Sequence, residues 1–520
     1  MNRLCPALVI AITVGACARG SALPRESIVP SRLRIVALND FHGALEPRPD
    51  ASGAVRGGAG AVAAAIERAA SECARPACEV LLLDGGDEFQ GTPASNLAFG
   101  RPVVEIFNRI GIAAAALGNH EFDWGQDTLR ARMRQARYAI LGANVRYADG
   151  SDVPWIRDDT LITRGKLRVG VIGVATKETA TSAKPTLIAD LRFVDAAPIV
   201  DSLAARLRAR GANLVVVVAH AGAFCSNNGT ASCNGEIVDL ARKLTPGRVD
   251  AIVSAHTHTR INTMVNGVPI VQAFARGTAI DVVDLPIARA GSVRAEVRDV
   301  FPDSVRADTA VARIAANAVA AVADIVNRPI ATIGETMYRD SLPLGNLIAD
   351  AFRVQGHGDF GVLNNFATRA DLRRGPATYG DVFEVQPFGN ILYRLTTTGD
   401  GMRRYFEKLV AGRRPRGYLS GAVVSYDTTR AVGARITSVC LPNGNALDST
   451  RTYSIVINDF MLAGGSGLGF EGPVIRSEAL NLSDLDAFIA QLRAASQPIA
   501  PPSDVRFTQT PTVQCRSTNR

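Results

Sequence analysis

This 520-residue sequence lacks a long apolar run. After its first residues, no stretch reaches the 18 or more uninterrupted apolar residues of a membrane-spanning helix. Basic runs interleaved with aromatic residues are also absent, which argues against nucleic acid as a partner. Lysine is scarce, with five lysines among 57 basic residues, and the formal net charge is +8. That charge suits anionic substrates, although a generally basic composition explains it equally well.

The N-terminus has the pattern of a secretion signal. A short basic start precedes an apolar stretch over residues 4–16 that ends in small residues. The stretch closes on Cys17 in the order Val-Gly-Ala-Cys, which resembles a bacterial lipobox. The alternative is an ordinary signal peptide cleaved slightly later, with Cys17 discarded. We expect a signal peptide over 1–17, a tether over 18–31 and an exported product: a periplasmic or cell-envelope lipoprotein attached only through Cys17, or a secreted protein.

Cysteine usage agrees with export. Six cysteines follow the signal: Cys73, Cys78, Cys225, Cys233, Cys440 and Cys515. An even set in an exported chain suggests disulfide bonds. Because six cysteines allow 15 connectivities, pairing by proximity is a hypothesis. A zinc site is the alternative, but the sequence contains no C-x₂-C spacing.

The chain is too long for one hydrophobic core and is expected to form two or three domains. Strand-like apolar runs alternate with helical patterns from Leu33 to about Pro286, which predicts helices covering a parallel or mixed sheet. An alanine-rich segment over 304–326 predicts a connecting helix, stopped before Pro329. A second mixed pattern follows. The expected parts are a domain over 32–303, a connector over 304–329, a domain over 330–510 and a tail over 511–520.

Five of the six histidines follow short apolar runs that predict buried strands: His42, His120, His220, His256 and His258. Oxygen ligands accompany them, namely Asp40, Asp87 and Asn119. In an open α/β sheet, ligands bind at the carboxyl ends of the strands. Imidazole, carboxylate and amide groups converging there indicate a metal site, and they are too many for one ion. The sequence therefore predicts a two-metal hydrolase.

Two motifs give this site its chemistry. Strand side chains alternate, so Asp40 and His42 can point to the same side, and a carboxylate such as Asp87 can bridge two cations. Asp84, three residues earlier, competes for that role. In the motif GNHEFD, His120 is free to face a substrate while Asp123 is close enough to hold its ring, as a general acid requires.

In this order, the motifs D-x-H, GD, GNHE, H and H-x-H resemble the dinuclear metallophosphatases. With the second block, the resemblance narrows to the 5′-nucleotidase family, which includes nucleotide-sugar hydrolases and cyclic-nucleotide phosphodiesterases. It covers about residues 33–475. It implies an α/β fold: an N-terminal four-layer α/β sandwich with mixed sheets, then a mixed α/β domain that binds the substrate.

The resemblance also implies roles for the site residues. One metal would be held by Asp40, His42, Asp87 and His258. The other would be held by Asp87, Asn119, His220 and His256, with Asp87 bridging. His120 and Asp123 would form the catalytic dyad. Two divalent ions, Zn²⁺, Mn²⁺ or similar, would provide a metal-bound hydroxide that attacks phosphorus in line.

In the second domain, the resemblance places Phe388 and Phe460 on either side of a nucleotide base, where stacking tolerates any base. Asn364 and Arg369 match further substrate-binding positions, but the glycines expected between them are replaced. Ser466 stands where the family usually has aspartate. Arg339 is the candidate for an upstream arginine of the family.

The expected function is therefore the hydrolysis of nucleotides, above all nucleoside 5′-monophosphates, to nucleoside and phosphate. The first alternative is the same dimetal site acting on a cyclic nucleotide, a nucleotide sugar or another anionic ester. The second is a surface protein that keeps the fold for binding without catalysis. The expected partner is a small nucleotide, and the sequence leaves the oligomeric state open.

Overall fold

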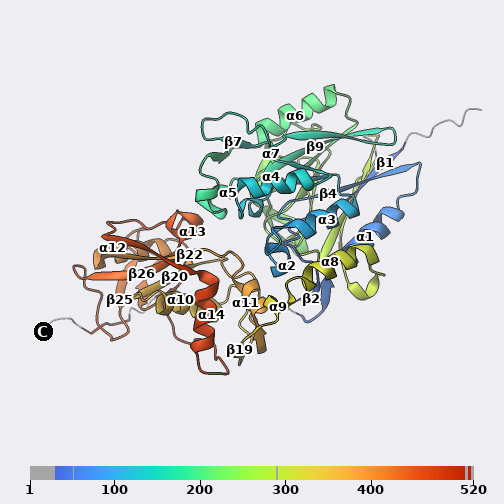
Figure 1. Ribbon diagram of the computed structural model, residues 1–520. Helices are drawn as coiled ribbons and strands as arrows, with labels where there is room; N and C mark the ends of the chain where they lie inside the picture. Colours follow the sequence, from blue (N-terminus) through green and yellow to red (C-terminus); the bar gives the residue numbers. More distant parts are fainter. Residues whose placement is uncertain (1–29, 51, 289–290, 510–512, 517–520) are drawn as a thin grey trace, which may run out of the picture.

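A computed structural model describes the chain except residues 1–29, 51, 289–290, 510–512 and 517–520 (Figure 1). The predicted signal peptide, Cys17 and most of the predicted tether lie outside the described residues. Within the described part, no helix combines the length and the apolar character needed to cross a membrane.

The N-terminal domain contains two six-stranded sheets. The first has the order β18 (Arg294–Asp299), β17 (Ala279–Pro286), β1 (Arg32–Leu38), β4 (Cys78–Asp84), β5 (Ala114–Ala116) and β6 (Ala139–Leu141). The second has the order β15 (Arg260–Val265), β16 (Val268–Ala273), β14 (Ala251–Ser254), β11 (Leu214–His220), β9 (Leu167–Ala175) and β8 (Asp159–Arg164). Both sheets have parallel central strands; antiparallel strands lie at one edge of the first sheet and at both edges of the second.

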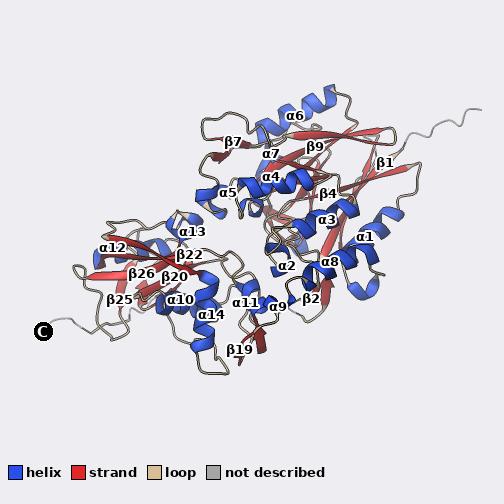
Figure 2. Ribbon diagram, in the orientation of Figure 1, coloured by secondary structure: helices blue, strands red, loops and turns tan. Residues whose placement is uncertain are grey.

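Helices cover the outer face of each sheet, which makes four layers (Figure 2). The two sheets share a core that includes Ile35, Leu81 and Val216. Helices α1 (Ala59–Ser71), α3 (Arg101–Ile110) and α8 (Thr309–Ala320) contribute to the core outside the first sheet. Helices α6 (Ala197–Ala209) and α7 (Glu236–Lys243) do so outside the second. Buried strands such as β11, apolar on both faces, are typical of such packing, and the predicted fold class is confirmed.

The predicted helix over 304–326 is wrong in extent. The side chain of Asp308 accepts the backbone N–H groups of Ala310 and Val311 at 2.8 and 2.9 Å, so it caps the helix and fixes its start. The helix α8 ends at Ala320, and a separate short helix, α9 (Ala323–Val326), follows. Since α8 packs on α1 and α3, and α9 on α11 (Tyr379–Val385), the chain passes between domains at the break.

The C-terminal domain is built on one five-stranded sheet. Its order is β23 (Gly417–Ser420), β20 (Phe360–Asn364), β26 (Thr452–Asn458), β22 (Ile391–Thr398) and β27 (Arg476–Ser483). Helices α10 (Leu342–Gln355) and α14 (Asp484–Ala494) pack on one face. The other face carries α12 (Gly399–Leu409) and a three-stranded sheet of β25 (Ile436–Cys440), β24 (Val423–Tyr426) and β28 (Phe507–Gln509). This domain lies beside the first, with α9 and α11 between them (Figure 1).

Three disulfide bonds join the cysteines as proximity predicts: Cys73–Cys78, Cys225–Cys233 and Cys440–Cys515. The third ties the end of the chain to β25. It closes a separation of 75 residues, whereas the first closes only five. The three bonds therefore constrain the unfolded chain very unequally.

Replacing both cysteines of Cys440–Cys515 by serine is expected to lower the free energy of unfolding by about 4 kcal/mol, from loop-closure entropy. The Cys73–Cys78 bond closes a far shorter loop, so replacing both of its cysteines by serine is expected to lower the free energy of unfolding by only about 2 kcal/mol. Urea denaturation followed by circular dichroism measures both. Equal losses in the two double variants would contradict the entropic explanation.

Candidate metal centre and catalytic dyad

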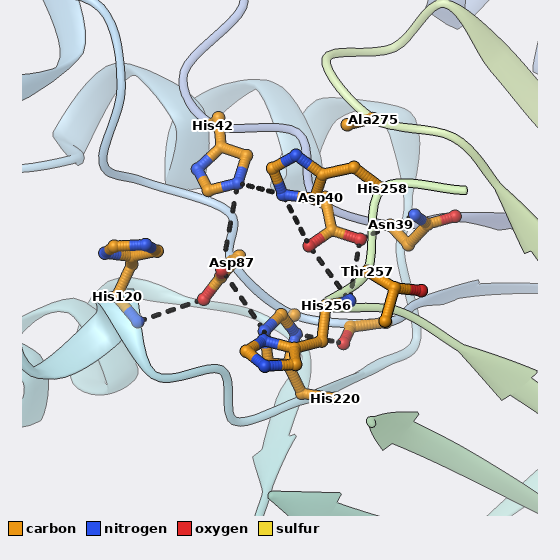
Figure 3. Close-up of polar contacts among 12 residues, drawn as sticks. Asn39, Asp40, His42, Asp87, His120, His220, His256, Thr257, His258 and Ala275 are labelled. Atoms are coloured by element: carbon orange, nitrogen blue, oxygen red, sulfur yellow. Dashed lines mark hydrogen bonds and ion pairs between the residues drawn. The ribbon is translucent and has the colours of Figure 1, made fainter. Parts of the chain in front are cut away.

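The predicted metal ligands meet where the strands of both sheets end (Figure 3). Asp40 and His42 follow β1, Asp87 follows β4, and Asn119 follows β5 in the first sheet. From the second sheet, His220 is the last residue of β11, while His256 and His258 follow β14. The carboxyl ends of five strands thus supply the cluster, as the sequence pattern predicts.

The backbone of this cluster is strained. Five site residues have a positive φ: Asp40 (49°), His42 (51°), Asp87 (57°), His256 (80°) and His258 (52°). Such conformations cost about 1–3 kcal/mol each for residues with side chains, and they concentrate at functional sites. The prediction that strand alternation aligns Asp40 with His42 is therefore wrong, because β1 ends at Leu38 and left-handed turns orient both side chains.

Two glycines allow the loops to approach so closely. A Cβ on Gly118 would lie 2.2 Å from Oδ1 of Asp87. A Cβ on Gly86 would lie 2.8 Å from the carbonyl oxygen of Ala116. The glycines of the GD and GNHE motifs thus leave room for the carboxylate of Asp87.

One group of donors consists of Asp40, His42 and His258. The two Nε2 atoms of His42 and His258 lie 3.0 Å apart, and His258 Nε2 lies 3.3 Å from Oδ1 of Asp40. Nδ1 of His42 lies 2.7 Å from the carbonyl oxygen of Gln90, so it donates its proton there. That leaves the Nε2 lone pair of His42 directed into the group, as metal ligation requires.

The second group consists of Asp40, Asp87 and His220. Asp40 is common to both groups, while Oδ2 of Asp87 lies 3.1 Å from Nε2 of His220 and 3.7 Å from Nε2 of His42, a member of the first group. Nε2 of His220 also lies 3.2 Å from Oδ1 of Asn119 and 3.3 Å from Nδ1 of His256. All seven predicted ligands are therefore brought together around Asp87.

Electrostatics in the cluster are dominated by burial and by the histidines. Burial raises the pKa of Asp87, but the charges of His220 and His120 outweigh it and hold that pKa well below its usual range. Burial lowers the pKa of His220, but Asp87 reverses the effect and raises it to about 10. Burial and repulsion by His258 keep the pKa of His42 well below its usual value. The charges of Asp87 and His220 therefore stabilise each other.

Asp84, the alternative candidate for the bridging role, has different hydrogen-bond partners from Asp87. It is fully buried, and one of its oxygens accepts the backbone N–H of Gly86 at 2.7 Å. Burial raises its pKa well above the usual range, and it belongs to neither group of donors in the described chain. Asp87, by contrast, belongs to the second group and lies near histidines of both groups.

The dyad lies at the side of this cluster. Nδ1 of His120 lies 2.7 Å from Oδ2 of Asp123, and the backbone N–H of His120 donates to Oδ1 of Asp87 at 3.0 Å. Burial lowers the pKa of His120, but the carboxylate of Asp123 outweighs it, and the net shift is upward. An imidazolium held by Asp123 can donate a proton from Nε2.

Sequence reasoning missed two acidic residues of the site. The side chain of Glu121 accepts three backbone N–H groups, from Gly118 at 2.8 Å and from Asp87 and Glu88 at 2.9 Å each. Glu178, 78 residues from His256 in sequence, lies 2.9 Å from its Nε2. Glu121 stands inside the GNHE motif and could have been found there, whereas nothing local in the sequence indicates Glu178.

The C-terminal domain brings two of its predicted substrate residues to the dyad. The ring of Phe388 stacks on the ring of His120, with centroids 6.0 Å apart. The guanidinium of Arg369 lies 5.9 Å from the Phe388 centroid. Lys184 and Asp459 form a further contact between the domains at 2.5 Å.

The other two substrate residues lie apart from the dyad. Phe460 packs on Gly465, where a Cβ would lie 2.5 Å from the ring. It is not among the rings that contact Phe388 or His120 in the described residues. Nδ2 of Asn364 donates to Oγ of Ser466 at 3.2 Å, so the serine in the usual aspartate position is bonded within the domain.

The unusual loop after Asn364 projects from the surface. Phe366 replaces one of the expected glycines, has a φ of 63° and keeps 74% of its side chain exposed. The candidate upstream arginine, Arg339, is exposed, and its Nε lies 3.5 Å from Asp340. The bulk of Phe366 therefore lies outside the domain core and does not fill it.

Comparison with known proteins agrees with this geometry. The calcineurin-like phosphoesterase family matches residues 33–260, and the 5′-nucleotidase C-terminal domain matches residues 318–472. Endonuclease YhcR of Bacillus subtilis is 30% identical over 505 residues, covering 90% of this chain, which spans 40% of the endonuclease. A 5′-nucleotidase of Vibrio cholerae is 25% identical over 508 residues, covering 89% of this chain and 90% of its own.

A solved structure supports the same conclusion. The 5′-nucleotidase precursor from Thermus thermophilus is 25% identical, with a TM-score of 0.78, over 92% of this chain and 99% of its own. The fold and the site thus define a metal-dependent phosphoesterase. The chain has the two-domain composition of the 5′-nucleotidases to which it is similar.

Replacing Glu121 by alanine is expected to lower the free energy of unfolding by about 3 kcal/mol or more, because three buried N–H groups lose their acceptor. Urea denaturation measures the loss. The matched control is alanine at Glu105, an exposed residue of α3, where less than about 0.5 kcal/mol is expected. If both variants were equally stable, Glu121 would not hold the two loops together.

Proposed function

We propose that this protein is an exported metal-dependent phosphoesterase that hydrolyses nucleotides, above all nucleoside 5′-monophosphates, to nucleoside and phosphate. One observation carries the proposal. His120, held by Asp123, lies between the metal-ligand cluster and the ring of Phe388 from the other domain. Phosphoryl chemistry and an aromatic surface suited to a base thus meet at one histidine.

The donors fit two divalent cations. We assign Asp40, His42, Asp87 and His258 to one ion and Asp87, Asn119, His220 and His256 to the other. Mixed nitrogen and oxygen donors suit Zn²⁺ or Mn²⁺, and the Nε2 atoms of His42 and His258, 3.0 Å apart, suit a shared cation. Such ions, when bound, activate water and polarise the phosphoryl oxygens.

The remaining steps belong to the chain. Asp123 keeps the proton on Nδ1 of His120, so that Nε2 faces the phosphoryl group and donates a proton to the leaving oxygen. Arg369 is placed to bind the phosphate, because its guanidinium lies over Phe388 beside the dyad. Burial of Asp40 and Asp87 excludes bulk water from the cluster and strengthens these interactions.

Substrate recognition is proposed to use Phe388 and Phe460 for the base, with Asn364 and Arg369 on the sugar-phosphate part. Because Asn364 already bonds Ser466, a sugar hydroxyl must compete for this pair. We therefore expect weaker selection for the sugar than for the phosphate. Export is supported by three disulfide bonds and by the predicted signal peptide.

A second candidate function is phosphodiester hydrolysis by the same site. It is favoured by the similarity to a protein named as an endonuclease, which extends over 90% of this chain. A phosphodiester substrate needs room for a second esterified group beside the scissile phosphate.

The test is phosphate release by the purified mature chain, stripped of metal and reloaded with Mn²⁺ or Zn²⁺. The substrates are AMP, ATP, a nucleotide sugar, a 2′,3′-cyclic nucleotide with a coupling phosphatase, and a simple aryl phosphate. Metal-dependent preference for AMP over the aryl ester is the expected result. Turnover of the aryl ester alone would remove nucleotides from the proposal, and preference for the cyclic nucleotide would favour the diester function.

Replacing His120 by alanine is expected to lower kcat by about 10²-fold or more, since the proton donor is lost. The metal content should stay unchanged, because His120 is outside the proposed ligand set. The matched control is alanine at His357, the sixth histidine, which is exposed on the C-terminal domain. Unchanged turnover in the His120 variant would remove this residue from the mechanism.

A further inference from the structure

A cavity of about 440 Å³ lies between the domains, next to the metal-ligand cluster. Its wall includes the segment around β2 (Pro47–Pro49), the turn at Arg276, and residues 369–377 of the C-terminal domain. Six arginines contribute to the wall: Arg48, Arg56, Arg276, Arg339, Arg369 and Arg373. The volume is in the range of small-molecule sites.

Some of these charges are neutralised locally. Arg56 lies 2.7 Å from Asp50 and 2.8 Å from Asp299, and Arg48 pairs with Glu384. By contrast, Arg276, Arg369 and Arg373 form no ion pair with a carboxylate among the described residues. The wall also carries five carboxylates, namely Glu46, Asp50, Asp371, Asp381 and Glu384. Arg276 and Arg369 lie at the domain boundary, where Nη2 of Arg276 donates to the carbonyl oxygen of Arg369.

Arg276 contacts both the metal-ligand loop and the C-terminal domain. Its backbone N–H donates to the carbonyl oxygen of Asp40 at 2.7 Å, and its Nη2 donates to the carbonyl oxygen of Arg369 at 2.7 Å. It thus connects the loop of a proposed metal ligand to the phosphate-binding arginine of the other domain. Its φ of 57° is a strained conformation.

Arg276 lies among several like charges and one strong opposite charge. Burial lowers the pKa of its guanidinium to about 10, attraction by Glu384 opposes this shift, and weaker repulsion by Arg369, Arg339 and Arg48 adds to it. Like charges held together in a half-buried cavity are stabilised when an anion bridges them.

We propose that this cavity is a second anion subsite, in which Arg276 binds a phosphoryl group other than the one at the metal-ligand cluster. Guanidinium groups bind phosphate oxygens through paired hydrogen bonds, and Arg373 supplies further donors, while Arg369 binds the phosphate beside the dyad. The phosphoryl group belongs to the remaining phosphate chain of a nucleoside diphosphate or triphosphate, or it is free inorganic phosphate. The first source rests on the proposed nucleotide hydrolase function, and the second does not.

The first experiment measures binding without turnover. Inorganic phosphate and pyrophosphate are titrated calorimetrically into the full, metal-stripped chain. Arg276→Gln is expected to weaken pyrophosphate binding by about tenfold, because a charged hydrogen-bond donor is lost. Arg56→Gln, at the same cavity but already paired, is the control and should change binding less than twofold.

Two further variants separate charge from structure. Arg276→Lys should restore most of the binding if charge is what matters, whereas a purely structural role for Arg276 predicts similar binding by the Lys and Gln variants. Arg373→Gln should weaken binding in the same direction but less, since Arg373 is exposed and donates only to the carbonyl oxygen of Pro49 among the described residues. The Arg373→Gln variant still tests the subsite if Arg276→Gln does not fold.

The second experiment identifies the source of the phosphoryl group. In the metal-loaded enzyme, Arg276→Gln is expected to lower the ratio of kcat/KM for ADP to that for AMP about tenfold if the phosphate chain occupies the cavity. An unchanged ratio together with weakened phosphate binding assigns the cavity to free phosphate. Unchanged binding of both phosphate and pyrophosphate would overturn the subsite. Absence of any turnover in the wild type would refute the proposed function alone.

Discussion

The carboxylate of Asp87 is the point on which the site depends. It is almost completely buried among imidazoles, and among the described residues its charge is balanced by His220, His120 and His42. Its loop is held by Glu121, whose carboxylate accepts hydrogen bonds from the backbone N–H groups of Asp87 and Glu88. The sheets serve to bring five strand ends to this one carboxylate.

Much of the site could be predicted from the sequence, because histidines and oxygen ligands recur directly after apolar strands. The order of these motifs also indicated Asp87 as the bridge, although Asp84 stood three residues away in the same motif. Both carboxylates are buried, but their partners differ: Asp84 accepts the N–H of Gly86, and Asp87 contacts the histidines. Such a difference depends on the turn and not on residue type.

Other features could not be predicted. The positive φ values at Asp40, His42 and His258 are imposed by contacts between loops from different strands, so the sequence pattern suggested strand alternation. The carboxylate of Glu178 reaches His256 across 78 residues. The single helix expected before the second domain is divided at Ala320, where packing on one domain gives way to packing on the other. These features depend on contacts between segments far apart in the sequence, so local propensity does not predict them.

The two domains share one electrostatic region, in which Nη2 of Arg276 donates to the carbonyl oxygen of Arg369 across the domain boundary and the guanidinium of Arg369 lies near Phe388. The central claim, however, is that Asp87 bridges two cations. The most direct test is the metal content per chain after loading and exhaustive dialysis, by inductively coupled plasma mass spectrometry, in the wild type and in Asp87→Ala. The account predicts two divalent ions in the wild type and almost none in the variant. Two ions retained without Asp87, or a single ion in the wild type, would contradict it.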